Sequence, residues 1–425
     1  MMKRKLMALV LCAGMTTALF TGCGGSTGSG SSAADSSASA SSAAGSSASA
    51  GSLDAVSTTS TDAAASGDSI TVGCVVNTTG QMAAYEVPAA NAMQMAVDEI
   101  NDAGGVKGKK INLELINAQS DASQNSTATT KLIDDGAPVI IGECESTLAM
   151  TAGSVAQAAG VPFITYGATL PDLPDRVGDC FYMTCYSDKV QAYAMAEYAY
   201  NDLGARTAYV IEDTTSEYTE ALSKYFKEHF TELGGSVVLE DSYDENGYTD
   251  YSAEIAKVQA LDAEPDILYF ASFSDQAPTM LSQFRSAGLS MPILSGDGFD
   301  AISIAEVAGK DANNVYYTTH IDVTSTDSSY TDFVKKYNDL YGSDPENAFA
   351  SLGYDTVYFV KDVLESIDGD ITKDSVKEAI GQVKDFKGLT GAISFEGDSH
   401  VPNKQVVIQE FKDGGVEHVT TIQPE

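Results

Sequence analysis

The sequence predicts an α/β fold of two doubly wound lobes, each with a parallel sheet, joined by hinge strands. Short apolar runs alternate with segments of helical period from residue 70 to about residue 319. This alternation is typical of parallel strands covered by helices on both faces. It contains too many units for one compact sheet, and 425 residues are enough to bury two cores. Two lobes are therefore the simplest arrangement.

The first group of elements begins at Ile70, where a Gly-, Ser- and Ala-rich segment gives way to apolar residues. The first helix should end at Gly104 and Gly105, because glycine is favoured in the left-handed conformation that follows a helix. Asp121 is the expected N-cap of the second helix. In chain order we expect strand 70–76, helix 89–100, strand 111–116, helix 121–134, strand 138–142, helix 146–159 and strand 161–165.

The second group repeats the alternation. In chain order we expect strand 207–211, helix 216–233, strand 236–239, helix 250–261, strand 266–270, helix 276–287, strand 292–294 and strand 315–319. In an open parallel sheet, ligands bind beyond the carboxyl ends of the strands. These ends are rich in hydroxyls, small polar residues and acids, which suits a hydrogen-bonding cleft: residues 77–79, 143–146, 166–169, 212–213, 272–275 and 296–299.

The N-terminus predicts export. Basic residues 3–5 precede an apolar run from Leu6 to Phe20 and then small residues before Cys23, as in a secretory signal. The apolar run is too short to span a bilayer comfortably. Leu19 to Cys23 resembles a bacterial lipobox, with Phe20 where leucine is usual. The resemblance implies that Cys23 is lipidated and anchors the chain to the cell membrane, outside the cytoplasm; an ordinary signal peptide with a stray cysteine is the alternative.

The segment behind the signal peptide predicts a tether. We assign residues 1–22 to the signal and residues 23–68 to a lipid-anchored segment made almost entirely of Gly, Ser, Ala and Thr. Such a composition cannot bury a core and stays flexible. The tether would keep the folded part near a partner in the membrane.

The charge of the chain limits its partners. It has 60 acidic and 24 basic residues and a formal net charge of -36. Such a surface repels phosphate backbones, so no nucleic-acid partner is expected. No apolar run after the signal is long enough to span a membrane, which argues against a channel or a membrane-embedded transporter.

Four cysteines fall in the folded part: Cys74, Cys144, Cys180 and Cys185. Export permits disulfides. Cys74 and Cys144 lie in apolar, strand-like contexts, where buried free thiols are common. We favour free thiols, and a disulfide is the alternative left open.

The sequence offers little catalytic chemistry. It has no Gly-x-Ser-x-Gly elbow and no His-Glu-x-x-His motif, and residues 104–110 lack the Gly-Lys-Ser/Thr ending of a phosphate loop. None of the four histidines has a partner at metal-ligand spacing. For His320 a structural role near a hinge is favoured, and Cys144 would be a nucleophile only beside a histidine brought in by the fold. We expect no enzyme activity, no cofactor and no metal.

The residues after the first strand resemble the start of a type I periplasmic-binding protein of the branched-chain amino acid receptor family. The matching signature is Thr79-Gly80, followed by Ala96-Val-Asp-Glu-Ile-Asn-Asp-Ala-Gly-Gly-Val-Lys-Gly108. The similarity extends from Ser69 to about Gly415. It implies a monomer with the type I periplasmic-binding fold. Lobe 1 would comprise 69–187 and 321–396 and lobe 2 would comprise 188–320 and 397–425, with hinge strands at 187–189, 319–324 and near 395–403.

The resemblance also implies a ligand held by its zwitterionic end. Ser146 and the turn Gly167-Ala168-Thr169 would bind an α-carboxylate through hydroxyls and main-chain N–H groups, which stabilise an anion without a buried cation. Asp297 would bind the α-ammonium group. For Ser146 and Thr169 the alternative is plain helix N-capping, and for Asp297 it is a turn acid beside a glycine.

Three aromatic residues complete the implied site. Tyr218 matches a residue that closes over the ligand from the second lobe, and ordinary packing on a helix is the alternative. Phe273 matches a position that is often tyrosine, so a hydroxyl would be missing. Tyr85 matches an aromatic residue near the side-chain pocket.

Three residues depart from the family pattern. Glu86 and Ala92 stand where the family commonly has glycine, and Glu145 directly precedes Ser146. If either acid points into the cleft, the ligand would carry a cationic or polar group.

The resemblance implies a solute-binding receptor of an ABC importer. It would bind a free amino acid with a branched-chain or other hydrophobic side chain and deliver it to a membrane permease encoded elsewhere. Three alternatives remain open: a ligand-sensing module for a signalling partner, the same fold with a small amide or aromatic acid as ligand, and a surface-anchored hydrolase.

Overall fold

The structure is a computed structural model that describes residues 69–395 and 399–423. The predicted signal peptide, the tether and Cys23 lie outside these residues. Among the helices of the described residues, none is both long and apolar enough to cross a membrane.

The first sheet is fully parallel. Its strands follow the order β2-β1-β3-β4-β5, and neighbouring strands pair in parallel register. They are β1 (Ser69–Val76), β2 (Lys110–Asn117), β3 (Ile140–Gly142), β4 (Phe163–Thr165) and β5 (Phe181–Met183).

The second sheet has a parallel core and an antiparallel edge. Its order is β14-β13-β10-β9-β8-β6-β7, and β13 and β14 pair antiparallel. This antiparallel edge was not predicted from the sequence. The strands are β6 (Thr207–Asp213), β7 (Ser236–Tyr243), β8 (Ile267–Ala271), β9 (Ile293–Ser295), β10 (Val315–Thr319), β13 (Val406–Lys412) and β14 (Gly415–Ile422). A separate hairpin pairs β11 (Phe386–Gly388) with β12 (Gly391–Ile393).

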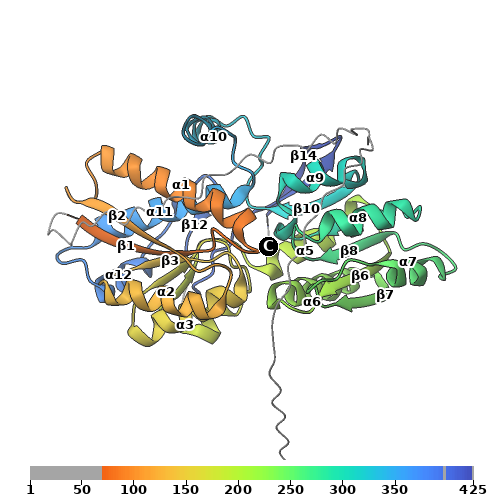
Figure 1. The fold of residues 1–425 in the computed structure, drawn as a ribbon, viewed down its shortest axis with the longest axis horizontal. Helices are drawn as coiled ribbons and strands as arrows, with labels where there is room; N and C mark the ends of the chain where they lie inside the picture. Colours follow the sequence, from red (N-terminus) through yellow and green to blue (C-terminus); the bar gives the residue numbers. More distant parts are fainter. Residues whose placement is uncertain (1–68, 396–398, 424–425) are drawn as a thin grey trace, which may run out of the picture. The chain divides into compact units, whose positions relative to one another are not determined.

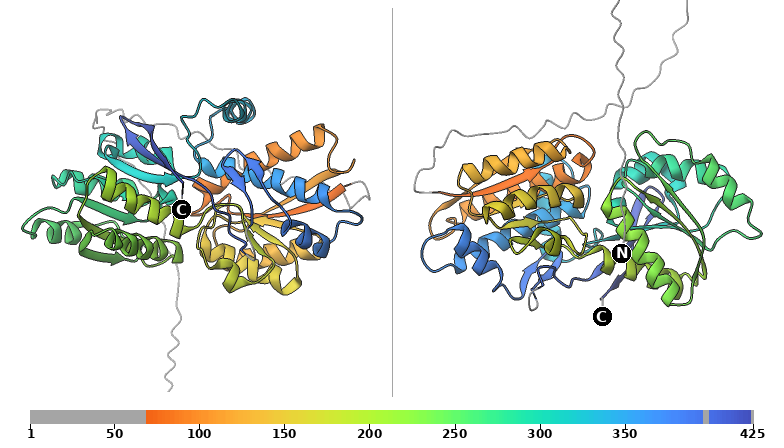
Figure 2. Two further views of the ribbon diagram at one scale, coloured as in Figure 1. Left: turned by 180° about the vertical axis from the view of Figure 1, so that it is seen from behind. Right: turned by 90° about the horizontal axis from the view of Figure 1, so that it is seen from below.

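Helices cover both faces of each sheet (Figures 1 and 2). On the first sheet α1 and α11 pack together on one face and α2 and α3 on the other; on the second, α5 and α6 pack together, as do α8 and α9. The helices are α1 (Ala83–Asp102), α2 (Ala122–Asp134), α3 (Ser146–Ala159), α4 (Leu173–Val177), α5 (Asp188–Glu197), α6 (Glu217–Glu232), α7 (Ser252–Gln259), α8 (Ala277–Ser286), α9 (Ile302–Ala308), α10 (Ser328–Tyr341), α11 (Ala348–Ser366) and α12 (Lys373–Ile380). This arrangement confirms the predicted α/β fold with two doubly wound lobes.

The two sheets share one strand order. The parallel strands β7-β6-β8-β9-β10 repeat the order β2-β1-β3-β4-β5 of the first sheet. In both sheets the order reverses beside the first strand of the lobe, between β1 and β3 and between β6 and β8. Such a switch point leaves a crevice at the carboxyl ends of the strands. Each lobe therefore offers a binding edge at the same place in its topology.

The chain passes between the sheets three times: from β5 to α5, from β10 to α10, and from β12 to β13. Lys404, on the third passage, is buried and donates from Nζ to the Thr184 carbonyl (3.0 Å) and to Thr390 Oγ1 (2.7 Å). Burial lowers the Lys404 pKa to about 8. The ammonium group thus joins the first and third passages through hydrogen bonds.

The first helix is longer than predicted. It begins at Ala83, although Pro88 lies within it. A proline inside a helix cannot donate to the carbonyl four residues earlier. Here Asn347 Nδ2 donates to that carbonyl, on Ala84, at 2.9 Å, and Asn347 Oδ1 caps α11 by accepting from Phe349 N. One side chain therefore serves both helices, which explains why α1 tolerates the proline.

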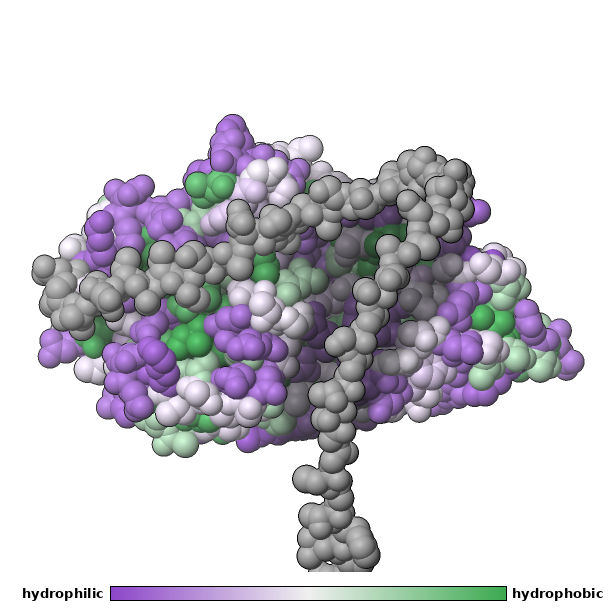
Figure 3. Space-filling view, viewed as in Figure 1, coloured by the Kyte–Doolittle hydropathy of each residue, from purple (hydrophilic) through white to green (hydrophobic). Residues whose placement is uncertain are grey.

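The hydrophobic residues form several buried clusters, and the largest extends through both sheets. A second cluster lies between the second sheet and helices α8 and α9 and includes Phe270, Phe284 and Phe299. Figure 3 shows hydrophilic residues over much of this face of both lobes, as the net charge leads one to expect. The apolar runs that the sequence predicts as strands therefore form the core.

Two buried acids lie together at the switch point of the first sheet. Glu86 accepts hydrogen bonds from Asn77 N and Cys144 N, and Glu143 Oε2 accepts from Asn77 Nδ2 at 2.5 Å. Glu143 Oε1 has no partner, and the residue has a positive φ of 55°. Burial, together with the nearby Glu86, raises the pKa of Glu143 well above its usual value. Burial raises the pKa of Glu86 as well, but hydrogen bonds from the Cys144 and Asn77 N–H groups oppose that shift. Glu143 is therefore the acid of the pair that holds a proton more readily.

Replacing Asn347 by alanine should destabilise the protein by about 2 kcal/mol, because it removes a helix cap and the donor to the Ala84 carbonyl. The matched control is Asp327→Ala, which removes the cap of α10 and an exposed contact with the Ser329 hydroxyl and should cost about 1 kcal/mol. Urea unfolding measures both. Equal costs would contradict the second role of Asn347.

Replacing Glu143 by glutamine should raise stability at neutral pH. The unfolded carboxyl has a pKa near 4.5 and the folded one is higher, so the folded state binds more protons. Stability then falls as pH rises above about 4.5, until the folded carboxyl ionises, and glutamine removes this loss. Glu86→Gln should instead destabilise the protein, because the amide NH2 group would face the backbone N–H of Asn77 or Cys144. Urea unfolding across pH tests both; a Glu143→Gln protein with the wild-type pH dependence would contradict the assignment.

Candidate functional site

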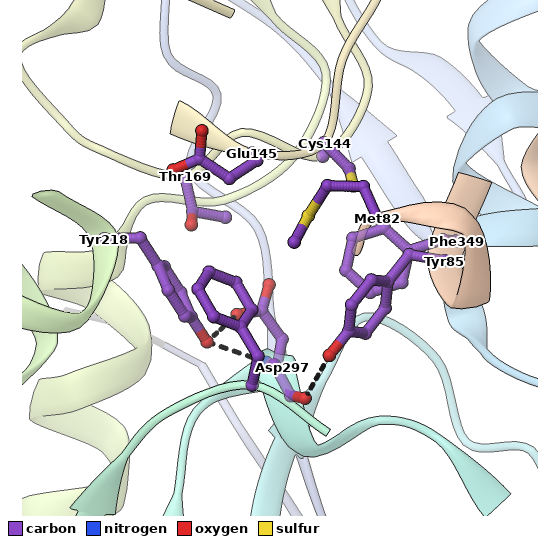
Figure 4. Close-up of a pocket in the computed structure, with 11 residues that line it drawn as sticks. Met82, Tyr85, Cys144, Glu145, Thr169, Tyr218, Asp297 and Phe349 are labelled. Atoms are coloured by element: carbon purple, nitrogen blue, oxygen red, sulfur yellow. Dashed lines mark hydrogen bonds between the residues drawn. The ribbon is translucent and has the colours of Figure 1, made fainter. Parts of the chain in front are cut away.

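A cavity with an empty volume of about 280 Å³ lies where the carboxyl ends of the two sheets meet. Figure 4 shows Glu145, Thr169 and Cys144 on one side of this cavity and Asp297 on the opposite side. Residues from both sheets line it: Met82, Tyr85, Cys144, Glu145, Gly167, Thr169, Tyr218, Phe273, Asp297, Gly298 and Phe349. Six of the eight residues predicted for ligand binding are among them, and Ser146 and Ala168 are not.

Asp297 is a buried carboxylate that faces this cavity. It follows β9 and opens a short 3₁₀ helix, Asp297–Phe299. Its Oδ1 accepts from Tyr218 OH (2.8 Å) and from Gln191 Nε2 (2.9 Å), and His320 Nε2 lies 3.0 Å from its Oδ2. Three side chains from separate elements therefore hold one carboxylate in place.

His320 is a neutral partner of this carboxylate. Burial lowers the His320 pKa, and the contact with Asp297 only partly opposes that shift. The neutral ring donates from Nε2 to Asp297 and stacks on Tyr186 with ring centres 3.8 Å apart. Within the part of the chain that the structure describes, no Lys or Arg contacts Asp297, so its charge is held by neutral hydrogen-bond donors.

Gln191 clamps Asp297 from α5. Its Nε2 donates to Asp297 Oδ1 and to Asp188 Oδ1 (3.0 Å), and its Oε1 accepts from Asp297 N (3.1 Å) and from Thr318 Oγ1. Burial, followed by the charge of Asp297, raises the pKa of Asp188 well above its usual value. Asp188 is thus kept neutral beside Asp297.

The wall of the cavity between these two sides is mainly apolar and aromatic. The Tyr85 ring lies edge-on to Phe349 (5.2 Å between centres) and Phe273 (6.5 Å), and Phe273 packs on Tyr218 (5.3 Å). Gly167 also belongs to this wall: a Cβ there would lie 2.9 Å from Cys144 and from Phe349. The close approach therefore requires glycine at position 167.

Tyr85 also ties the two sheets together. Its hydroxyl donates to the Gly298 carbonyl (2.7 Å) and accepts from Ser274 N (2.9 Å), although Tyr85 is on α1 and both partners follow strands of the second sheet. Further contacts cross the cleft between Gln81 and Glu245, between Arg176 and Glu217, and between Glu145 and Ser216.

Three of the groups expected to bind a carboxylate already have partners within the protein. Ser146 Oγ accepts from Leu170 N (3.3 Å), and the Gly167 and Ala168 N–H groups donate to Thr165 Oγ1 (3.3 and 2.9 Å). Thr169 is the hydroxyl of this group that lines the cavity.

Glu145 is the N-cap of α3, so the alternative of Ser146 as that cap is wrong. Glu145 Oε2 accepts from Leu148 N (2.8 Å), and its Oε1 accepts from Ser216 Oγ (2.9 Å), at the start of α6. Of the two acids that depart from the family pattern, Glu145 lines the cavity, whereas Glu86 lies behind Cys144.

Several residues of the site were not predicted. Met82 and Phe349 stand at the starts of α1 and α11, where the apolar period gives no cue. Gln191 and the contact of His320 with Asp297 were missed because both depend on side chains brought together from distant elements. Tyr218, Gly167 and Phe273 were found through the family motif.

The chemistry of the lining argues against catalysis. Burial and the charge of Glu86 raise the pKa of the Cys144 thiol well above its usual value, which disfavours the nucleophilic thiolate. Cys74, Cys144, Cys180 and Cys185 are free thiols. Within residues 69–395 and 399–423, no group of three or more His, Cys, Asp or Glu side chains could hold a metal ion.

Two comparisons of sequence identify relatives. A family model described as periplasmic binding protein matches residues 69–416. Leu/Ile/Val-binding protein homolog 3 of Brucella melitensis is 26% identical over 356 residues, covering 83% of this chain and 94% of that protein. Leu/Ile/Val-binding protein BraC3 of Rhizobium johnstonii is 25% identical over 349 residues, covering 82% and 93%.

Solved structures agree with the sequence match. LivJ from Streptococcus pneumoniae, a branched-chain amino acid transporter substrate-binding protein in complex with isoleucine, has a TM-score of 0.77 at 28% identity and covers 84% of this chain and 100% of its own. The leucine-binding protein LivK from Thermotoga maritima has a TM-score of 0.76 at 27% identity, covering 84% and 99%. A benzoate-bound solute-binding protein from Rhodopseudomonas palustris, at 20% identity and a TM-score of 0.73, shares the fold.

These matches confirm the predicted family and fold, and they confirm that the protein is not an enzyme. The family also places the chain outside the cytoplasm. The chain belongs to the periplasmic binding protein family, as a type I solute-binding protein of the ABC transporter kind related to the branched-chain amino acid receptors.

Proposed function

We propose that the protein is the receptor of an ABC importer and binds a small ammonium-bearing ligand, a free amino acid with a branched-chain or other hydrophobic side chain. The observation that carries the proposal is the buried Asp297 carboxylate, which faces an apolar cavity and has neutral partners only. A ligand ammonium group would supply the missing positive charge through a charge-assisted hydrogen bond.

The size and lining of the cavity support the side-chain class. The rings of Tyr85, Phe273 and Phe349 crowd the cavity, so the ligand is small. Met82, Phe273 and Phe349 offer apolar surface to an aliphatic group. The names of the Brucella and Rhizobium relatives and the isoleucine in the Streptococcus structure point to the same class.

The ligand would hold the two lobes together. Tyr85 and Thr169 would contact it from lobe 1, and Tyr218 and Asp297 from lobe 2. A ligand that touches both lobes favours the closed arrangement by its higher affinity for that state. We propose the lobe boundaries predicted from the sequence, with motion about the three passages between the sheets.

We propose that the protein functions at the membrane surface. A lipid on Cys23 and the polar tether, residues 23–68, would hold a monomeric receptor near its permease and raise its effective concentration there.

A thermal-shift screen of the common amino acids, small amides and aromatic acids tests the proposal. Leucine, isoleucine or valine should raise the melting temperature, because a ligand that binds only the folded state stabilises it. Stabilisation by none of these amino acids would reject the assignment of ligand and leave the fold intact.

Asp297→Asn should weaken binding of the preferred amino acid by about 2–5 kcal/mol, the usual cost of removing one partner of a buried charge pair. Asp188→Asn is the matched control: this acid is already neutral, lies in the same cluster and does not line the cavity. Titration calorimetry measures both. Equal affinities of the Asp297→Asn and wild-type proteins would contradict the ammonium contact.

A further inference from the structure

We propose that Glu245 and Gln81 form a proton-dependent latch at the rim of the cleft, which makes the lobes close and the ligand bind more tightly at mildly acidic than at mildly alkaline pH. Neither residue lines the cavity, so the latch leaves the assignment of the ligand unchanged. The inference rests on the proposed function, because binding of a free amino acid is its measure of closure.

The first observation is that the two residues meet across the cleft. Gln81 directly precedes Met82, which lines the cavity, and Glu245 follows β7 of the second sheet. Gln81 Nε2 donates to Glu245 Oε1 at 2.6 Å. This contact forms only when the lobes are together, so opening of the cleft returns the Glu245 carboxyl group to water.

The second observation is the set of acids around Glu245. Asp213 ends β6 and Asp275 follows β8, so three acids stand at the carboxyl ends of the adjacent strands β8, β6 and β7. Asp213 Oδ1 accepts from Glu245 N at 3.2 Å, which holds the two acids side by side. None of the groups that shift the Glu245 pKa most is a cation: Gln81, Asp213, Asp275 and Thr215. An ionised Glu245 therefore meets like charges without a positive partner.

The third observation is an unpaired oxygen. Glu245 Oε2 is buried and has no hydrogen-bond partner among the described residues. A negative charge on such an oxygen loses its hydration without gaining a donor. A proton on Oε2 removes that charge, while Oε1 still accepts from Gln81. The closed contact therefore favours the neutral carboxyl group over the carboxylate.

The direction of the pH effect follows from the pKa of Glu245. Burial, with the charges of Asp213 and Asp275, raises it to about 7 in the closed protein. Opening restores the hydration that Gln81 and its lobe exclude and lowers the pKa toward the ordinary value. Between these two pKa values, closure takes up a proton from the solvent, so it is favoured at lower pH and weakens as the pH rises through about 7. Above that pH both states are ionised and the dependence ends.

Titration calorimetry at pH about 5.5, 6.5 and 7.5 tests the latch, because this range spans the ordinary and the raised pKa of a carboxyl group. The ligand is whichever of leucine, isoleucine and valine stabilises the protein most, and two buffers of different ionisation enthalpy report the protons taken up on binding. Glu245→Gln keeps an acceptor for Gln81 but cannot titrate, and Gln81→Ala leaves Glu245 exposed to water. The control is Glu217→Gln, a second rim acid, which pairs with Arg176 across the cleft.

We expect the wild-type affinity to fall about fivefold from the lowest to the highest pH, with uptake of protons on binding. Glu245→Gln and Gln81→Ala should lose most of this dependence, and Glu217→Gln should keep it. Asp300, whose pKa burial raises to about 6, titrates in the same range in all four proteins, so the comparison between variants carries the result. A purely structural role of Glu245 would change the affinity equally at every pH.

Equal pH profiles of wild type and Glu245→Gln, or a wild-type affinity that does not fall with pH, would overturn this inference alone. Loss of the dependence in Glu217→Gln would also overturn it, because the effect would then belong to the rim acids in general. Failure of leucine, isoleucine and valine to bind wild type at any of these pH values would overturn the proposed function and this inference with it.

Discussion

The buried carboxylate of Asp297 is the constraint on which the site depends. An isolated buried anion costs so much free energy that it must be hydrogen-bonded or paired. Here Gln191, Tyr218 and His320 meet that requirement from three different elements of the second lobe and its border. All three are uncharged donors, so the carboxylate is held in place while its charge remains available to a ligand.

The same contacts connect the ligand end of the cavity to the passages between the lobes. Gln191 reaches Asp188, which directly follows the first passage, and Thr318, at the end of β10 before the second. His320 itself follows β10. A ligand cation bound to Asp297 would therefore be connected, through Gln191 and His320, to residues that border both passages. At the other end of the cavity, Ser216 donates to Glu145 across the cleft. Contacts at both ends of the cavity therefore depend on how the two lobes are arranged.

Much of the fold could be predicted from the sequence, because buried parallel strands appear as short apolar runs between segments with helical periodicity. The carboxyl ends of those strands meet at one edge, which is why Thr169 and Asp297 could be placed in one cleft before the structure was known. The antiparallel strands β13 and β14 and the helices after residue 319 lie beyond the clear alternation and were missed. Helix α1 was predicted too short because the compensation of Pro88 by Asn347 spans much of the chain.

The partners of the site residues were harder to predict than the residues themselves. A sequence shows that Ser146 and the 167–169 turn follow strands. It does not show that the Gly167 and Ala168 N–H groups donate to Thr165 or that Ser146 Oγ accepts from Leu170 N. Likewise, nothing local marks Gln191 or Phe349, whose roles arise from packing between distant segments.

A crystal structure of the protein with its preferred amino acid or amide tests the central claim most directly. We expect the ligand nitrogen in the cavity, about 2.7–2.9 Å from an Asp297 carboxylate oxygen, with Gln191, Tyr218 and His320 still bonded to that carboxylate. A ligand whose ammonium group points away from Asp297, or that binds outside this cavity, would contradict it.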